Sequence, residues 1–144
     1  ADLAVGGGTA KKVTGVIANT NTTISTASLA DGTYKIIAVD TVGNVSAEST
    51  NIVTVDSTAP TASVGTALIP STAGVTNAQS TETGTVYLVL DSANITTVAA
   101  AEAAVTGVTA KKSTVATANT NTSIATTGLS DGTYKVISVQ NPLT

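Results

Sequence analysis

The sequence repeats itself at an interval of 100 residues, and this feature constrains the fold more than any other. Shifting the chain by 100 positions superposes residues 1–40 on residues 101–140, with 24 of 40 positions identical. The matching stretches include Asp-Gly-Thr-Tyr-Lys, at residues 31–35 and again at 131–135. A fixed period of this kind is the signature of a repeated structural unit. The 144 residues therefore hold about 1.4 copies of a 100-residue repeat.

A module boundary is predicted after residue 56. The strand-like stretch Ile-Val-Thr-Val-Asp ends there and is followed by Ser-Thr-Ala-Pro, a polar segment closed by proline, which is typical of a connection. We predict that residues 1–56 are a partial module holding the later strands of a repeat. Residues 57–144 are then a module that lacks its closing strand. The last four residues, Asn-Pro-Leu-Thr, depart from the repeat and are interpreted as a genuine end.

The residue types favour β-strands. Threonine is the commonest residue, at 30 of 144, and Val and Ile are also abundant; these β-branched side chains suit a pleated surface. Residues 84–91 alternate in a strand pattern, with Val86, Leu88 and Leu90 on one face. The only helix-prone stretch is the Ala-rich segment 98–105. Further strands are predicted at residues 51–56, with Val53 and Val55 facing inward, and at 111–117, 121–127 and 133–139, with a tight turn at 129–132.

Many short strands separated by turns, without a long amphipathic helix, predict an all-β fold built as an antiparallel β-sandwich. The core of the second module is predicted to contain Val86, Leu88, Leu90, Ile124, Leu129, Tyr134 and Val136.

Two matching six-residue stretches carry a family resemblance. Leu29-Ala30-Asp31-Gly32-Thr33-Tyr34 recurs as Leu129-Ser130-Asp131-Gly132-Thr133-Tyr134. Each resembles the tyrosine corner of Ig-like sandwiches, which implies that the Tyr34 and Tyr134 hydroxyls bond to backbone a few residues upstream. With residues 38–46 and 53–60, these stretches resemble the tandem bacterial Ig-like repeats of large secreted adhesins and of biofilm or surface-layer proteins. The resemblance implies an Ig-like fold, an extracellular location at the bacterial cell surface, and a structural or adhesive role.

The resemblance also implies calcium, because many such repeats are stiffened by calcium ions at their junctions. The candidate ligands are Asp40 and Asn44, in an Asp-x-x-Gly-Asn loop, and Asp56, with Asp91 as a further candidate. Calcium takes six to eight oxygen ligands, including carboxylates. The alternative is that Asp40 and Asn44 form a hydrogen-bonded turn and that Asp56 simply ends a strand.

The ionisable residues exclude several functions. Without histidine or cysteine, the usual catalytic triads, cysteine nucleophiles and zinc sites cannot be built, so we expect no enzyme. A net charge of −3, with six lysines in no basic cluster, argues against nucleic acid as a partner. No apolar run is long enough to span a membrane.

Two functions remain, from different classes. The first is a structural repeat in an adhesin stalk or surface filament, and the alternative is an Ig-like module that binds a glycan or a host protein through its loops. For the first, we expect partners to be other copies of the chain or neighbouring repeats. The missing closing strand would leave an open edge beside residues 134–139, and a strand from another copy would complete it head to tail. Excision of the 144 residues from a longer array is the simpler alternative. The exchanged strand is predicted to comprise Asn51, Ile52, Val53, Thr54, Val55 and Asp56.

Overall fold

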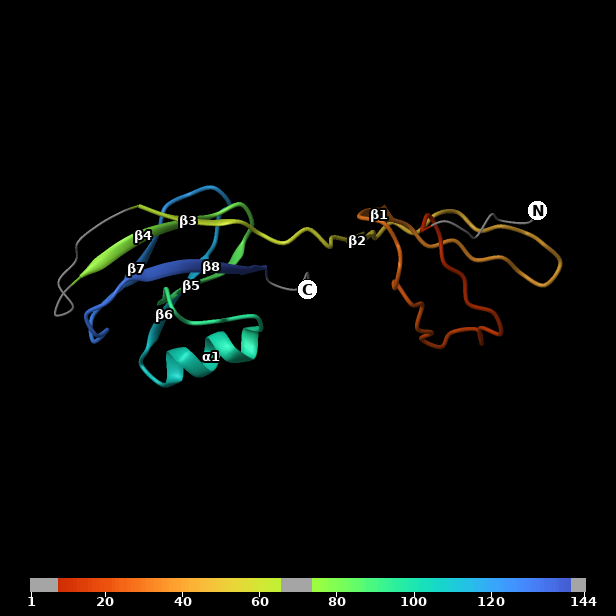
Figure 1. Ribbon diagram of the computed structural model, residues 1–144. Coiled ribbons are helices and arrows are strands. Elements are labelled where there is room, and N and C mark those ends of the chain that lie inside the picture. Colours follow the sequence, from red (N-terminus) through yellow and green to blue (C-terminus); the bar gives the residue numbers. More distant parts are fainter. Residues whose placement is uncertain (1–7, 66–73, 141–144) are drawn as a thin grey trace. The chain divides into compact units, whose positions relative to one another are not determined.

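The computed structural model describes residues 8–65 and 74–140. The chain divides into two compact units, Ala1–Thr58 (unit 1) and Ala59–Thr144 (unit 2), and each is described by itself. The described residues form mostly strands in antiparallel sheets with one short helix (Figure 1). At this level the predicted all-β fold is confirmed. The final Asn-Pro-Leu-Thr segment lies outside the described residues.

In its described residues, 59–65 and 74–140, unit 2 contains two antiparallel sheets of three strands each. One sheet has the order β3-β4-β7 and the other has the order β6-β5-β8. Strand β5 is central in its sheet, with Leu88 opposite Val136 of β8 and opposite Lys111 of β6. The strands are β3 (Ala62–Val64), β4 (Val75–Ser80), β5 (Gly84–Leu90), β6 (Ala110–Val115), β7 (Thr122–Ala125) and β8 (Tyr134–Gln140).

One hydrophobic cluster joins the two sheets of unit 2. Ala78 of β4 and Ile124 of β7 come from one sheet, and Val86, Leu88 and Val115 come from the other. Leu129 completes the buried set, with Tyr134 and Val136 packed against it. Of the predicted core, Val86, Leu88, Ile124 and Leu129 are buried, Tyr134 and Val136 are half-buried against the cluster, and Leu90 is half-buried outside it.

A second cluster covers the opposite face of β5. Tyr87 and Val89 pack there with Ala110 of β6 and with Ala101 of helix α1 (Val98–Thr106), all buried. The helix begins at Thr97, whose side chain accepts a hydrogen bond from the backbone N–H of Ala100. Its alanines carry small side chains, which bring the helix close to the sheet. The helix-prone stretch 98–105 thus forms a short helix, and β5 is buried on both faces.

Unit 1 is a long, exposed hairpin with connecting segments. Strands β1 (Gly32–Tyr34) and β2 (Val53–Val55) pair antiparallel, and further along the hairpin Val39 pairs with Val45. None of the described residues 8–58 is buried. Val55 is half-buried, but Val53 is 40% exposed, so the prediction that it faces inward is wrong. The physical reason is that no described second sheet covers β2 as β4 and β7 cover β5 in unit 2.

Candidate functional site

The two tyrosines of the repeated motif have the same hydrogen bond. The Tyr34 hydroxyl donates to the carbonyl oxygen of Ala30 at 2.7 Å, and the Tyr134 hydroxyl donates to that of Ser130 at 2.8 Å. Both acceptors lie four residues upstream, which agrees with the expected bond to backbone a few residues upstream. Each bond joins a strand residue, the last of β1 or the first of β8, to the turn before that strand.

The turn before each tyrosine is also the same in both copies. The backbone N–H of Leu29 donates to Thr26, and that of Leu129 to Thr126, both at 3.0 Å. The hydrogen-bonded turn therefore precedes Leu129, whereas the sequence places it at residues 129–132. Gly128 supplies the left-handed conformation that this turn needs, with φ of 81°.

The Asp40–Asn44 loop closes on itself through the Asp40 carboxylate. One oxygen, Oδ1, accepts from the backbone N–H groups of Val42 at 3.0 Å and Asn44 at 2.8 Å, and Oδ2 accepts from Asn44 Nδ2 at 2.8 Å. These bonds, that of the Asn44 side chain above all, lower the pKa of Asp40 below its ordinary value. Both carboxylate oxygens of Asp40 therefore already accept hydrogen bonds within a turn. This agrees with the alternative to calcium binding, in which Asp40 and Asn44 form a hydrogen-bonded turn.

The third candidate calcium ligand lies at the other end of the hairpin. Asp56 follows Val55, which pairs with Gly32, whereas Asp40 lies at the far tip. Extended chain from residue 32 to residue 40 spans roughly 26 Å at about 3.3 Å per residue. A calcium ion needs its oxygens about 2.4 Å away, so Asp40 and Asn44 cannot share one with Asp56 within a unit.

The remaining acidic side chains offer no better calcium site. In residues 8–65 and 74–140, no three Asp, Glu, His or Cys side chains gather as a metal site would require. Asp91, the further candidate, uses its backbone carbonyl to accept from Lys135 Nζ at 2.7 Å. The residues that the structure describes do not fit a calcium ion.

The Asp31 carboxylate accepts hydrogen bonds from the last residues of unit 1, a role that was not predicted from the sequence. Its Oδ1 accepts from the backbone N–H and the hydroxyl of Ser57 at 2.8 and 2.7 Å, and its Oδ2 accepts from the Thr58 hydroxyl at 3.1 Å. The bonds from Ser57 lower the pKa of this carboxyl. Asp31 thus holds the chain as it leaves β2, and the repeat gives this position a counterpart in Asp131.

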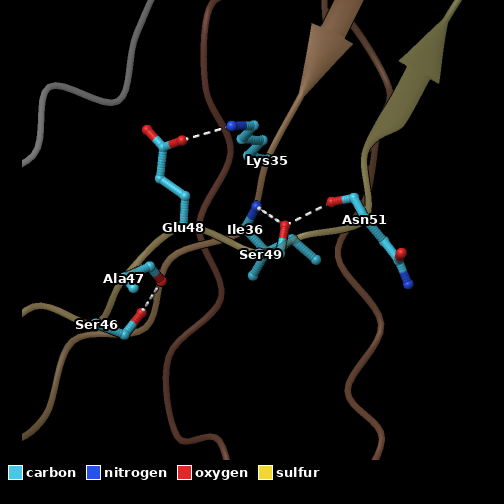
Figure 2. Close-up of polar contacts among 7 residues, drawn as sticks. All are labelled: Lys35, Ile36, Ser46, Ala47, Glu48, Ser49 and Asn51. Carbon is cyan, nitrogen blue, oxygen red and sulfur yellow. Dashed lines mark hydrogen bonds and ion pairs between the residues drawn. The ribbon is translucent and has the colours of Figure 1, made fainter.

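The returning arm of the hairpin, residues 45–55, binds residues 34–40 through two serines, and Figure 2 shows the contact of Ser49 with Ile36. The Ser49 N–H donates to the Ile36 carbonyl at 2.9 Å, and its Oγ accepts from the Ile36 N–H at 3.0 Å. Ser46 contacts Ala38 in the same way, with both distances 2.9 Å. Each serine thus satisfies both backbone groups of one facing residue.

The other contacts of this arm lie on either side of the serines. Lys35 Nζ and Glu48 Oε2 form an exposed ion pair at 2.7 Å, which lowers the pKa of Glu48 (Figure 2). Of the predicted exchange strand Asn51–Asp56, Val53–Val55 pair with β1, and the Asn51 carbonyl accepts from the Ser49 hydroxyl at 2.7 Å.

A polar cluster in unit 2 was not predicted either. The Tyr87 hydroxyl donates to Glu102 Oε1 at 2.6 Å, and Lys112 Nζ lies 2.8 Å from both oxygens of that carboxylate. Burial, and then the bond to Glu102, raise the pKa of Tyr87 to about 12. The bond from Lys112 lowers the pKa of Glu102. The cluster ties α1 to β5 and β6.

In the described part of the chain, no helix has both the length and the apolar character to cross a membrane. Neither the family models, nor the curated proteins, nor the solved structures include a match to this chain.

Proposed function

We propose that this chain is a non-enzymatic structural module of a repetitive extracellular protein at the bacterial cell surface, with an Ig-like β-sandwich as its repeating fold. The observation that carries the proposal is the duplicated tyrosine turn. Tyr34 and Tyr134 lie 100 residues apart and make the same hydrogen bond, at 2.7 and 2.8 Å. A turn that recurs with its hydrogen bond intact is expected in an array of equivalent modules that do the same mechanical job.

The chemistry of the side chains supports a structural role. The chain has no histidine or cysteine, and most of its described buried side chains are apolar. The polar cluster of Tyr87, Glu102 and Lys112 holds the helix on the sheet. Acid–base catalysis needs a positioned group poised to exchange a proton near neutral pH, and the shifts of Tyr87 and Glu102 both move away from neutrality.

The same repetition favours a spacer over a receptor-binding module. The Asn-Thr-Asn-Thr loop and the Leu-x-Asp-Gly-Thr-Tyr turn both occur twice in 144 residues. A dedicated recognition site needs one copy of its loops, whereas a stalk needs many equal modules. Adhesion by the whole protein then depends on the length and stiffness of the array.

Two measurements test this function. Sequencing the encoding gene on both sides of this segment should reveal further copies with the 100-residue period. The purified chain, applied to arrays of glycans and of extracellular-matrix proteins, should bind none of them above background. A gene without further copies, or saturable binding to one glycan or protein that is lost when the loops at residues 19–22 and 119–122 are replaced, would overturn the spacer assignment in favour of a binding module.

A further inference from the structure

Residues 91–109, which we call the strap, cover one face of the β6-β5-β8 sheet. They connect β5 to the neighbouring strand β6, and α1 forms within them. The covered face holds Tyr87 and Val89 of β5, both buried, and α1 contributes the buried Ala101 to the same cluster. The opposite face of β5 carries the cluster that joins the two sheets, so the strap covers one face of the strand and takes no part in the contact between the sheets.

The strap ends in a strained residue. Val108 has a φ of 61°, in the left-handed region, and among the described non-glycine residues with such a backbone it is the only β-branched one. Two hydrogen bonds hold it there: the Val108 N–H donates to the Val105 carbonyl at 3.1 Å, and the Thr109 N–H donates to the Ala104 carbonyl at 3.0 Å. These bonds close the C-terminus of α1 in a pattern that usually has glycine at this position. The strain is therefore relieved when the end of the helix opens.

The other copy of the repeat has glycine at this position. Gly8 occupies the repeat position of Val108 and has the same left-handed backbone, with a φ of 77°. Glycine adopts this conformation without steric cost. The same backbone requirement is thus met without strain in unit 1 and with strain in unit 2. Strained residues persist where the surrounding structure imposes them, and they are concentrated in segments that switch between two states.

The contacts that hold the strap on the sheet are weak. Of the nine residues of α1, all of which the structure describes, only Ala101 is buried. Glu102 accepts from the Tyr87 hydroxyl, and its ion pair with Lys112 is exposed, at 42% and 44% for the two side chains. Ion pairs with this exposure contribute little to stability. A helix of nine residues is also marginal in water without tertiary contacts, so α1 unfolds when it leaves the sheet.

We propose that the strap opens as one unit, with Val108 as its hinge, while both sheets of unit 2 stay folded. Opening relieves the strain at Val108 and exposes the apolar face formed by Tyr87 and Val89. Strand β5 stays paired with β6 and β8, and its other face stays in the cluster between the sheets. The contacts of the strap lie inside unit 2, so its opening goes beyond the proposed structural function and does not depend on it.

Two buried valines on opposite faces of β5 report the opening. Val89 is 1% exposed beneath the strap, and Val86 is 0% exposed in the cluster between the sheets. The protein has no cysteine, so Val89→Cys and Val86→Cys each carry a single thiol in place of a side chain of similar size. Without denaturant, a thiol reagent should label Val89→Cys at least about tenfold faster than Val86→Cys, because Val89 needs only the strap to open whereas Val86 needs unit 2 to unfold. Equal labelling rates would overturn the proposal.

Glycine at the hinge tests the role of the strain. In the Val89→Cys chain, Val108→Gly should slow labelling about fivefold, because the closed state loses a steric cost and gains a smaller entropic one. The matched control is Val98→Gly at the other end of α1: Val98 is 49% exposed and Val108 is 54% exposed, but Val98 has an ordinary helical backbone. The control should speed labelling about twofold, because glycine disfavours a helix. An unchanged rate in the Val108→Gly chain, or slower labelling with both glycines, would refute Val108 as the hinge.

Hydrogen exchange of the unmodified chain gives an independent test that needs no cysteine variant to fold. The amides of α1 should exchange at least about tenfold faster than those of β5. Their exchange should also change little with urea, because opening the strap exposes far less surface than unfolding unit 2. If the amides of α1 and β5 exchanged at the same rate, with the same dependence on urea, the strap would open only when the whole unit unfolds, and the proposal would be wrong.

Discussion

Replacing Ile124 with alanine tests where the stability of unit 2 resides. Ile124 is fully buried (0% exposed) in the cluster that joins the two sheets. Removal of three carbons costs about 2.4 kcal/mol in transfer free energy, at about 0.8 kcal/mol each. A residual cavity of roughly 50 Å³ adds about 1.2 kcal/mol, at roughly 24 cal/mol per Å³. We expect the free energy of unfolding of unit 2 to fall by about 3.6 kcal/mol.

The repeat provides a matched control for this change. Ile24 is the same residue at the same repeat position, but it is only half-buried in unit 1. Its replacement by alanine should cost at most about half as much, because less apolar surface returns to water. That cost should fall on unit 1 and leave the free energy of unfolding of unit 2 unchanged.

Hydrogen exchange read by mass spectrometry separates the two units. Amides of β5, the central strand of its sheet, should exchange roughly 400-fold faster in the Ile124→Ala chain, since about 1.4 kcal/mol corresponds to a tenfold change in an equilibrium constant. The same amides should be unaffected in the Ile24→Ala chain. If β5 exchanged equally fast in both variants, or if Ile124→Ala changed nothing, the assignment of the core to unit 2 would be refuted.

Three further outcomes follow from the contacts described above. Tyr134→Phe removes the hydrogen bond to Ser130 and should lower the free energy of unfolding of unit 2 by about 1 kcal/mol in urea titrations; an unchanged midpoint would contradict a role for that bond. The pKa of Tyr87 is raised from 10.0 to about 12, so the stability it contributes is fully present below about pH 10 and is lost as the pH rises through about 12. Tyr87→Phe should remove this part of the alkaline loss of stability, and the same pH dependence with and without the hydroxyl would count against it. Calcium followed by chelator should leave the melting temperature unchanged, because the Asp40 carboxylate is occupied by N–H donors; a calcium-dependent rise would show that the loop opens to bind the ion.

The sequence predicted the residues of the unit 2 core well, because strand alternation is a local pattern with a clear periodicity. Residues 84–91 show it, and β5 forms there with Val86 and Leu88 buried. The polar contacts were harder to foresee. Tyr87, Glu102 and Lys112 are separated by 15 and 10 residues, and no local motif relates them. Asp31 was missed for the same reason, since its partner Ser57 lies 26 residues away.

The two copies of the repeat separate what the sequence determines from what the tertiary structure decides. The turns are the same in both: Asn19 and Asn119 are left-handed, with φ of 59° and 58°, and the bonds from Leu29 to Thr26 and from Leu129 to Thr126 are both 3.0 Å. These interactions close within a few residues, so the local sequence is enough to specify them.

The strands differ between the copies even where the residues are identical. Ala-Lys-Lys at residues 110–112 begins β6, whereas Ala-Lys-Lys at residues 10–12 is not in a strand. Ile124 is buried and Ile24 is only half-buried. A ladder requires the backbone groups of a second strand, and a buried side chain requires an opposing surface. In unit 2, β5 and β4 provide both, while the described part of unit 1 has no equivalent of either strand. Local sequence therefore determined the turns of this protein, and only the presence of partner strands decided which segments became sheet and core.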